Sequence, residues 1–252
     1  MNGSVKLVRI TSGDLSKFST GTPTNIEWQS NDSDIHQIHK IHLKTVIFPN
    51  SNYNINKYNT VLNITAADMV AVGAIPIGQY NIVDYMAALE VVLDVAAAPN
   101  TFTVSQDLLT RKLIFTKSGG AEFTLPGLDT NLQARESGSK VAKTSVGLTA
   151  TASSMVDLSG LRHIYIESLI AGKQLLTGNV NKYSVIADIP ISVGFGEYQT
   201  YDFNEETLNQ VTYRGAKQLS KIDIRFTDDQ NRELELNGLD WVLIFEAHGV
   251  NP

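Results

Sequence analysis

The sequence predicts an all-β protein, an antiparallel sandwich with one helix and long loops. About a dozen short segments alternate apolar and polar residues, which is the period of a half-buried strand. Turn-forming residues, chiefly Asn, Gly and Pro, separate these segments. Only residues 83–95 have the spacing of a long amphipathic helix, with Asn81 as its expected N-cap and Pro99 beyond its end.

The strongest local pattern lies at residues 219–246. Strict alternation predicts a strand at 222–226, and the polar cluster 228–231 predicts a turn. Leu234 and Leu236 predict a second strand, and Asn237-Gly238 is a strong hairpin signal. A third strand at 239–246 would complete a three-stranded meander. Alternate residues of that strand share a face, so we expect Trp241 to be buried with Leu239, Leu243 and Phe245.

The remaining strands follow from the same alternation. Three of them, 101–106, 111–117 and 121–125, are predicted to form two consecutive hairpins, the second turning at Gly119-Gly120. The other predicted strands are 5–10, 25–29, 35–48, 59–65, 161–169, 182–191 and 208–213, and residues 11–24 are predicted to be a polar linker. A double-sheet jelly roll accommodates this many short strands because its wrapping limits exposed edges. The expected fold is therefore an antiparallel jelly-roll sandwich.

Length and composition limit the possible functions. The 252 residues are compatible with one domain over 1–252, in which 131–144 is expected to be a mobile surface loop or a partner-binding loop. The absence of cysteine excludes disulfides, thiolate zinc sites and cysteine nucleophiles. A net charge of −6 argues against a large electrostatic footprint on nucleic acid or anionic lipid, and no specific nucleic-acid site is expected. No run of 18 apolar residues occurs, so we expect no membrane span.

The sequence predicts no catalytic, cofactor-binding or metal-binding residues. His36, His39 and His42 have a spacing that places the middle histidine on the opposite face of a strand. Solvated positions on a strand edge are favoured over a metal site for them. His163 and His248 are isolated, and no nucleophile-elbow pattern occurs. Gly194-Phe195-Gly196 predicts a bend rather than a phosphate-binding loop, and Glu136-Ser-Gly-Ser139 has ordinary linker composition.

Three ordered segments, which together cover most of the chain, carry a resemblance to a known family. They are the long strand running into Pro49-Asn-Ser-Asn-Tyr-Asn-Ile55; residues 75–84 with the helix and the 102–125 hairpins; and the strand 161–168 with the ending 221–231 to 237–241. In order and spacing they resemble the single jelly-roll minor capsid, or penton, proteins of virophages and Polinton-like viruses. The loop 131–144 departs from the pattern of that family.

The resemblance implies a structural virion protein at the five-fold vertices of an icosahedral capsid, made in the host cell cytoplasm. It implies a homopentamer, contacts to a double jelly-roll major capsid protein, no enzyme activity and no cofactor. The sequence also leaves two other functions open. A carbohydrate-binding or receptor-binding module, or a viral spike, would use exposed aromatics such as Tyr53, Tyr58, Tyr198 and Tyr201. A cupin-like metalloenzyme would need two or three converging histidines and a carboxylate.

Overall fold

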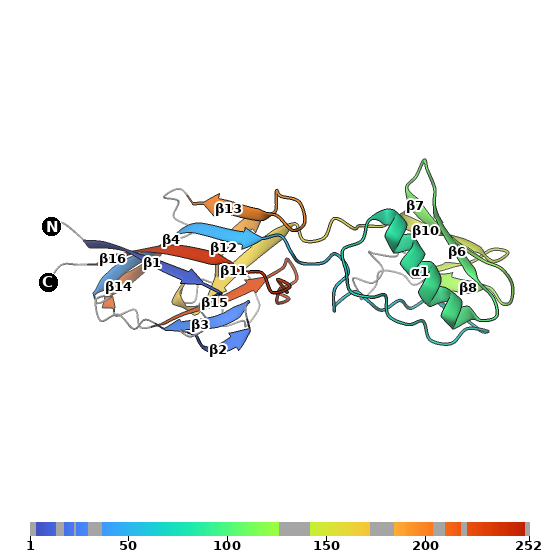
Figure 1. Cartoon of the computed structure of the whole chain (residues 1–252), viewed down its shortest axis with the longest axis horizontal. Coiled ribbons are helices and arrows are strands. Elements are labelled where there is room, and N and C mark those ends of the chain that lie inside the picture. Colours follow the sequence, from blue (N-terminus) through green and yellow to red (C-terminus); the bar gives the residue numbers. More distant parts are fainter. Residues whose placement is uncertain are drawn as a thin grey trace. The chain divides into compact units, whose positions relative to one another are not determined.

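The computed structural model describes residues 4–13, 18–22, 24–29, 37–125, 142–171, 184–203, 210–217 and 221–249. The chain divides into two compact units (Figure 1). Unit 1 comprises Met1–Asn52 with Leu161–Pro252, and unit 2 is the segment Tyr53–Gly160 inserted between them. The sequence predicts one domain over 1–252. The difference arises because each unit buries its own apolar cluster, and no composition break marks the boundary between them.

Unit 1 contains ten of the strands and forms two sheets. The strands are β1 (Ser4–Thr11), β2 (Phe18–Thr22), β3 (Asn25–Gln29), β4 (Ile38–Pro49), β11 (His163–Ser168), β12 (Ser184–Pro190), β13 (Tyr198–Asp202), β14 (Gln210–Lys217), β15 (Lys221–Thr227) and β16 (Val242–Gly249). One sheet has the order β1-β16-β4-β13, with β14 also paired to β4, and the other has the order β12-β11-β15-β3-β2. A short 3-10 helix, η2 (Leu169–Ala171), follows β11.

The strand order of unit 1 is that of a single jelly roll. Every strand pair recorded in its two sheets is antiparallel. The first strand of the chain lies beside the last, and β15 and β16 belong to different sheets. β13 and β14 pair with different halves of β4, so together they occupy one strand position. This interleaving of two antiparallel sheets confirms the predicted fold class.

The core of unit 1 lies between the two sheets. In β15 and β16 buried and half-exposed residues alternate, so one face of each strand packs inward. Trp241 is fully buried, as predicted, and its ring centroid lies 4.8 Å from that of Phe226. Leu243 and Phe245 share its environment, whereas Leu239 is 36% exposed and lies outside the core, contrary to the prediction.

The predicted C-terminal meander is wrong. Asn237 and Gly238 do adopt the positive φ angles, 50° and 78°, that the hairpin signal requires. The turn nevertheless joins no paired strands, because Leu234 and Leu236 are buried core residues on a segment that crosses from one sheet to the other. β15 pairs with β3 and β11, while β16 pairs with β1 and β4.

Unit 2 packs one helix against short strands. Its elements are α1 (Ile82–Ala97), β5 (Thr65–Ala66), β6 (Phe102–Gln106), β7 (Lys112–Lys117), β8 (Phe123–Leu125), β9 (Lys143–Thr144) and β10 (Thr149–Met155). The sheets have the orders β10-β7-β6 and β5-β8-β9. The Asn81 side chain accepts from the backbone N–H groups of Val83 and Asp84, so the predicted N-cap is confirmed.

Two carboxylates of α1 protect the edge of the sheet formed by β6. Glu90 accepts the backbone N–H of Val104 at 2.7 Å, and Asp94 accepts that of Phe102. An edge strand with free N–H groups is open to pairing with another chain, and these side chains occupy two of those groups. The buried residues Leu89 and Leu93 pack the same helix onto the unit 2 core.

Several sequence predictions for the connecting segments need correction. β6 and β7 form the first predicted hairpin, but β8 pairs with β5 and β9 instead of with β7. In the predicted strand 59–65 only an isolated bridge at Val61 and the start of β5 are extended, because the Asn59 side chain bonds nearby backbone. The predicted polar linker 11–24 contains β2. Of the loop 131–144, residues 131–141 lie outside the described residues and Lys143–Thr144 form β9.

Candidate functional site

The histidines of β4 do not occupy the solvated edge positions that the sequence predicts. β4 is an inner strand between β16 and the β13/β14 position, and His42 is only 4% exposed. The register with β16 shifts at His39, and the His39 ring lies 6.4 Å from the ring of His248. His36 lies outside the described residues. The prediction fails because the alternation of β4 does not reveal that the strand lies inside the sheet.

Glu246 on β16 is the acidic centre of this cluster. Its carboxylate lies 4.0 Å from His42 Nδ1 and 3.9 Å from His248 Nε2, and it accepts a hydrogen bond from the Lys44 ammonium. That hydrogen bond is the main reason why the pKa of Glu246 is lowered, and it raises the pKa of Lys44. The carboxylate is therefore held ionised beside a cation. Within the described residues no three His, Cys, Asp or Glu side chains are placed to bind a metal ion.

The four tyrosines considered for ligand binding belong to different units. Tyr198, 52% exposed, lies at the start of β13, and Tyr201 packs against Phe203 and the unit 1 core. Tyr58 belongs to unit 2, where the Lys57 ammonium lies 5.1 Å from its ring centroid. Neither compact unit by itself therefore contains all four rings.

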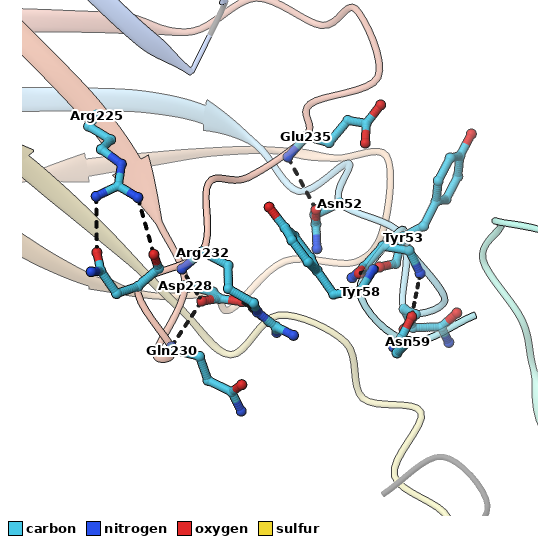
Figure 2. A network of polar contacts seen from close by, with 12 residues as sticks. Asn52, Tyr53, Tyr58, Asn59, Arg225, Asp228, Gln230, Arg232 and Glu235 are labelled. Carbon is cyan, nitrogen blue, oxygen red and sulfur yellow. Dashed lines mark hydrogen bonds and ion pairs between the residues drawn. The ribbon is translucent and has the colours of Figure 1, made fainter. Parts of the chain in front are cut away.

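A polar network holds the crossing segment that follows β15. Figure 2 shows Arg232 and the backbone of Gln230 converging on the carboxylate of Asp228, with the Arg232 Nε–Oδ2 distance at 2.7 Å. Arg225 binds Glu167 on the neighbouring strand β11, with 3.2 Å between guanidinium and carboxylate. Burial nevertheless raises the pKa of Glu167, because the loss of solvation outweighs the attraction of Arg225. The predicted turn at 228–231 is confirmed, and the Arg225–Glu167 pair is the part that local sequence could not reveal.

The same segment is tied to the end of β4. Asn52 accepts the backbone N–H of Glu235, as Figure 2 shows, and Ser51 donates to the carbonyl of Leu236 at 2.8 Å. Asn237 donates to the carbonyl of Ser51. These bonds join residues almost two hundred positions apart, and they explain why Asn and Ser are placed directly after Pro49.

Asn54 connects three separate segments of unit 2 through its side chain. Its side chain donates to the carbonyls of Tyr80 and Leu158 at 2.8 and 3.1 Å and accepts the N–H of Tyr80 at 2.9 Å. One buried amide thus joins the start of the inserted segment to a residue close to its end. Because an unpaired buried amide is costly, this arrangement favours one geometry for the inserted chain.

The predicted bend at Gly194–Gly196 belongs to unit 1 and has a structural role. Gly196 has φ 84°, and its backbone N–H donates to the carbonyl of Asn50.

A buried lysine organises the turn after β7. Lys117 is 2% exposed, and its ammonium binds the carboxylate of Asp68 and the carbonyl of Ala121. Asp68 also accepts the N–H of Ala121 at 3.0 Å. Gly120 has φ 84°, and a Cβ there would meet the Asp68 carboxylate at 1.9 Å, so only glycine fits. The predicted turn at Gly119-Gly120 therefore packs directly against the Lys117–Asp68 ion pair.

Asp68→Asn is expected to destabilise unit 2 at neutral pH, because it leaves the buried ammonium without its counterion. The hydrogen bond from Lys117, followed by that from the Ala121 N–H, lowers the pKa of Asp68 from its ordinary value of 3.8. A lowered pKa contributes stability that is complete above the unfolded value and is lost as pH falls through the folded one. Thermal melts followed by circular dichroism should show the largest difference between variant and wild type at neutral pH. A difference that persists unchanged in strong acid would contradict this assignment.

Comparisons with known proteins reveal a likeness to solved structures. No protein-family model matches the sequence, and neither does any curated protein with which it was compared. Among solved structures, the chain is similar to the penton protein of mavirus, in its selenomethionine-labelled crystal form. The likeness covers 98% of this chain and 100% of that one at 13% sequence identity, with a TM-score of 0.48. The jelly-roll assignment given above depends on the strand order of unit 1 alone.

Proposed function

We propose that this chain is a structural virion protein, a penton subunit that forms homopentamers at the five-fold vertices of an icosahedral capsid. The observation that carries the proposal is the single jelly roll of unit 1, with β1 beside β16 and an inserted unit between β4 and β11. Jelly rolls also occur in lectins and cupins, so the fold alone does not decide the role. The ordered sequence segments that resemble penton proteins favour the capsid role. The proposal includes no enzymatic activity and no cofactor.

A cyclic assembly requires two different surfaces on each subunit that fit one another, with a rotation that closes the ring. The net charge of −6 means that subunits repel one another mildly at low ionic strength. Salt shortens the range of that repulsion, so we expect assembly to strengthen as salt is added. Contacts to a double jelly-roll major capsid protein would lie on the outer flanks of the ring. The protein would be made in the host cell cytoplasm and then reside in the virion.

The oligomeric state tests the assembly part of the proposal. Analytical ultracentrifugation or mass photometry across a salt series should show a species of five subunits whose share grows with ionic strength. A monomer at every salt concentration, at tens of micromolar protein, would reject self-assembly in solution. A closed ring of another size would reject the pentamer while keeping the heterologous contact.

In the part of the chain that the structure describes, no helix combines the length and the apolar character that crossing a bilayer requires.

A further inference from the structure

The turn that joins β6 to β7 presents two adjacent leucines to solvent. Leu108 is 83% exposed and Leu109 is 93% exposed. Isolated apolar residues are common on protein surfaces, but a contiguous exposed patch is typical of an interaction site. Met155 is 60% exposed and pairs with Lys112 at the start of β7, so it lies at the same end of the sheet. Figure 1 shows the β6–β7 connection as a narrow point of unit 2.

This turn has a fixed backbone. Asp107 Oδ1 accepts the N–H groups of Leu109 and Thr110 at 2.9 and 2.6 Å and the Thr110 hydroxyl at 2.9 Å. The Arg111 N–H donates to the carbonyl of Asp107 at 2.8 Å, and the Asp107 N–H donates to the carbonyl of Lys112 at 2.9 Å. The two leucines are thus held outward by a closed set of hydrogen bonds. A polar pair would satisfy the same turn, so the turn itself does not require leucine.

The charges around the leucines are mainly positive. Arg111 and Lys112 follow the leucines after Thr110, and the Arg111 side chain is exposed. Asp107 is the one acid of the turn, and its carboxylate is engaged by three donors of the turn itself. Those bonds, first that from the Thr110 N–H, lower the pKa of Asp107, so it remains ionised and does not weaken the turn. One net positive charge therefore remains at this tip, in a chain whose net charge is −6.

We propose that Leu108, Leu109 and Met155, with Arg111 and Lys112, form a membrane-contact tip that binds the surface of a bilayer containing anionic lipid. Leucine side chains would enter the boundary between headgroups and acyl chains, where apolar burial is favourable. The two cations would meet the anionic headgroups, which attract basic residues near the surface. The backbone suits this environment, because four of its N–H groups are already bonded within the hairpin and need no water.

A single tip would bind the membrane through its own leucines and cations, so the proposal does not require the pentamer. Several tips on one assembly would bind more strongly than one, because each later contact is intramolecular. A protein pocket lined by apolar residues is the other partner that two exposed leucines could fit. The adjoining cations favour lipid, since an apolar pocket gives no role to Arg111 and Lys112.

Flotation of the full-length protein with vesicles tests the tip. The probes are phosphatidylcholine vesicles with and without phosphatidylserine, at millimolar lipid. We expect binding to the anionic vesicles and weaker binding to the neutral ones. Leu108→Ser/Leu109→Ser should lower the partition coefficient at least about tenfold, and Arg111→Gln/Lys112→Gln should abolish the preference for phosphatidylserine.

A matched control is available on the helix of the same unit. Val83 and Val91 are each 65% exposed, so Val83→Ser/Val91→Ser removes comparable exposed apolar surface away from the tip. Circular dichroism should show that all three variants keep the wild-type fold. Absence of vesicle binding by the wild type, or equal losses in the leucine and valine variants, would overturn the proposal. Sedimentation of the same samples without lipid reports assembly separately, so failure of the tip is distinguishable from failure of the proposed penton role.

Discussion

Trp241→Ala is expected to lower the free energy of unfolding of unit 1 by about 3–5 kcal/mol. The indole is fully buried between the sheets and contacts the ring of Phe226. The Trp241 backbone N–H donates to Ser12 Oγ at 3.0 Å, and the Ser12 backbone N–H donates to the Trp241 carbonyl. Removing the ring leaves a cavity beside a backbone that these bonds hold in place, so collapse cannot recover the lost contacts.

Urea denaturation followed by tryptophan fluorescence measures this effect. Trp28 on β3 is buried in unit 1 and still reports unfolding in the variant. Leu239→Ala is the matched control, because Leu239 is two residues away and 36% exposed. The control should change stability by less than about 1 kcal/mol, as expected of a site outside the core. An equally small effect of Trp241→Ala would show that the sheets do not pack around this residue.

Leu89→Ala should destabilise unit 2 by about 2–5 kcal/mol. Leu89 is fully buried on α1, where it belongs to the cluster that also contains Tyr85, Leu93 and Phe115. Alanine keeps the helix propensity high, so the expected loss comes from packing and not from the helix itself.

Val91→Ala on the same helix provides the comparison, since Val91 is 65% exposed. That change should be within about 0.5 kcal/mol of neutral. Both variants are followed by the helical circular dichroism signal at increasing urea, because the two tryptophans lie in unit 1. Equal effects of the two substitutions would contradict the placement of α1 on the unit 2 core.

Local signals in the sequence predict individual elements well. The alternation of 222–226 identifies β15, and Asn81 with the helical spacing identifies α1 and its start. These features depend on neighbours in sequence, so a short window contains them. The dihedral angles of Asn237-Gly238 are predicted for the same reason.

Sheet membership is not a local property, and the strand pairing predicted for residues 222–246 is therefore wrong. Leu234 and Leu236 alternate as a strand would, yet their burial on a crossing segment places β15 and β16 in different sheets. Burial of His42 is likewise set by the strands on either side of β4, which come from distant parts of the chain. The division into two units also depends on which residues share a core.

The surface features also differ in whether the local sequence predicts them. The Arg225–Glu167 pair joins β15 to β11 across 58 positions and has no local signature. The leucine tip does have one, because Leu108 and Leu109 fall between two predicted strands where turn residues are ordinarily polar. Exposure of both leucines then follows from the Asp107 turn that the structure reveals.

Electron cryomicroscopy of purified virus particles, with mass spectrometry of the same preparation, tests the proposed capsid role most directly. The account predicts that the protein copurifies with the particles and that its jelly-roll unit fits the density at the five-fold vertices. Purified particles that lack the protein, or vertices built from a different chain, would contradict it.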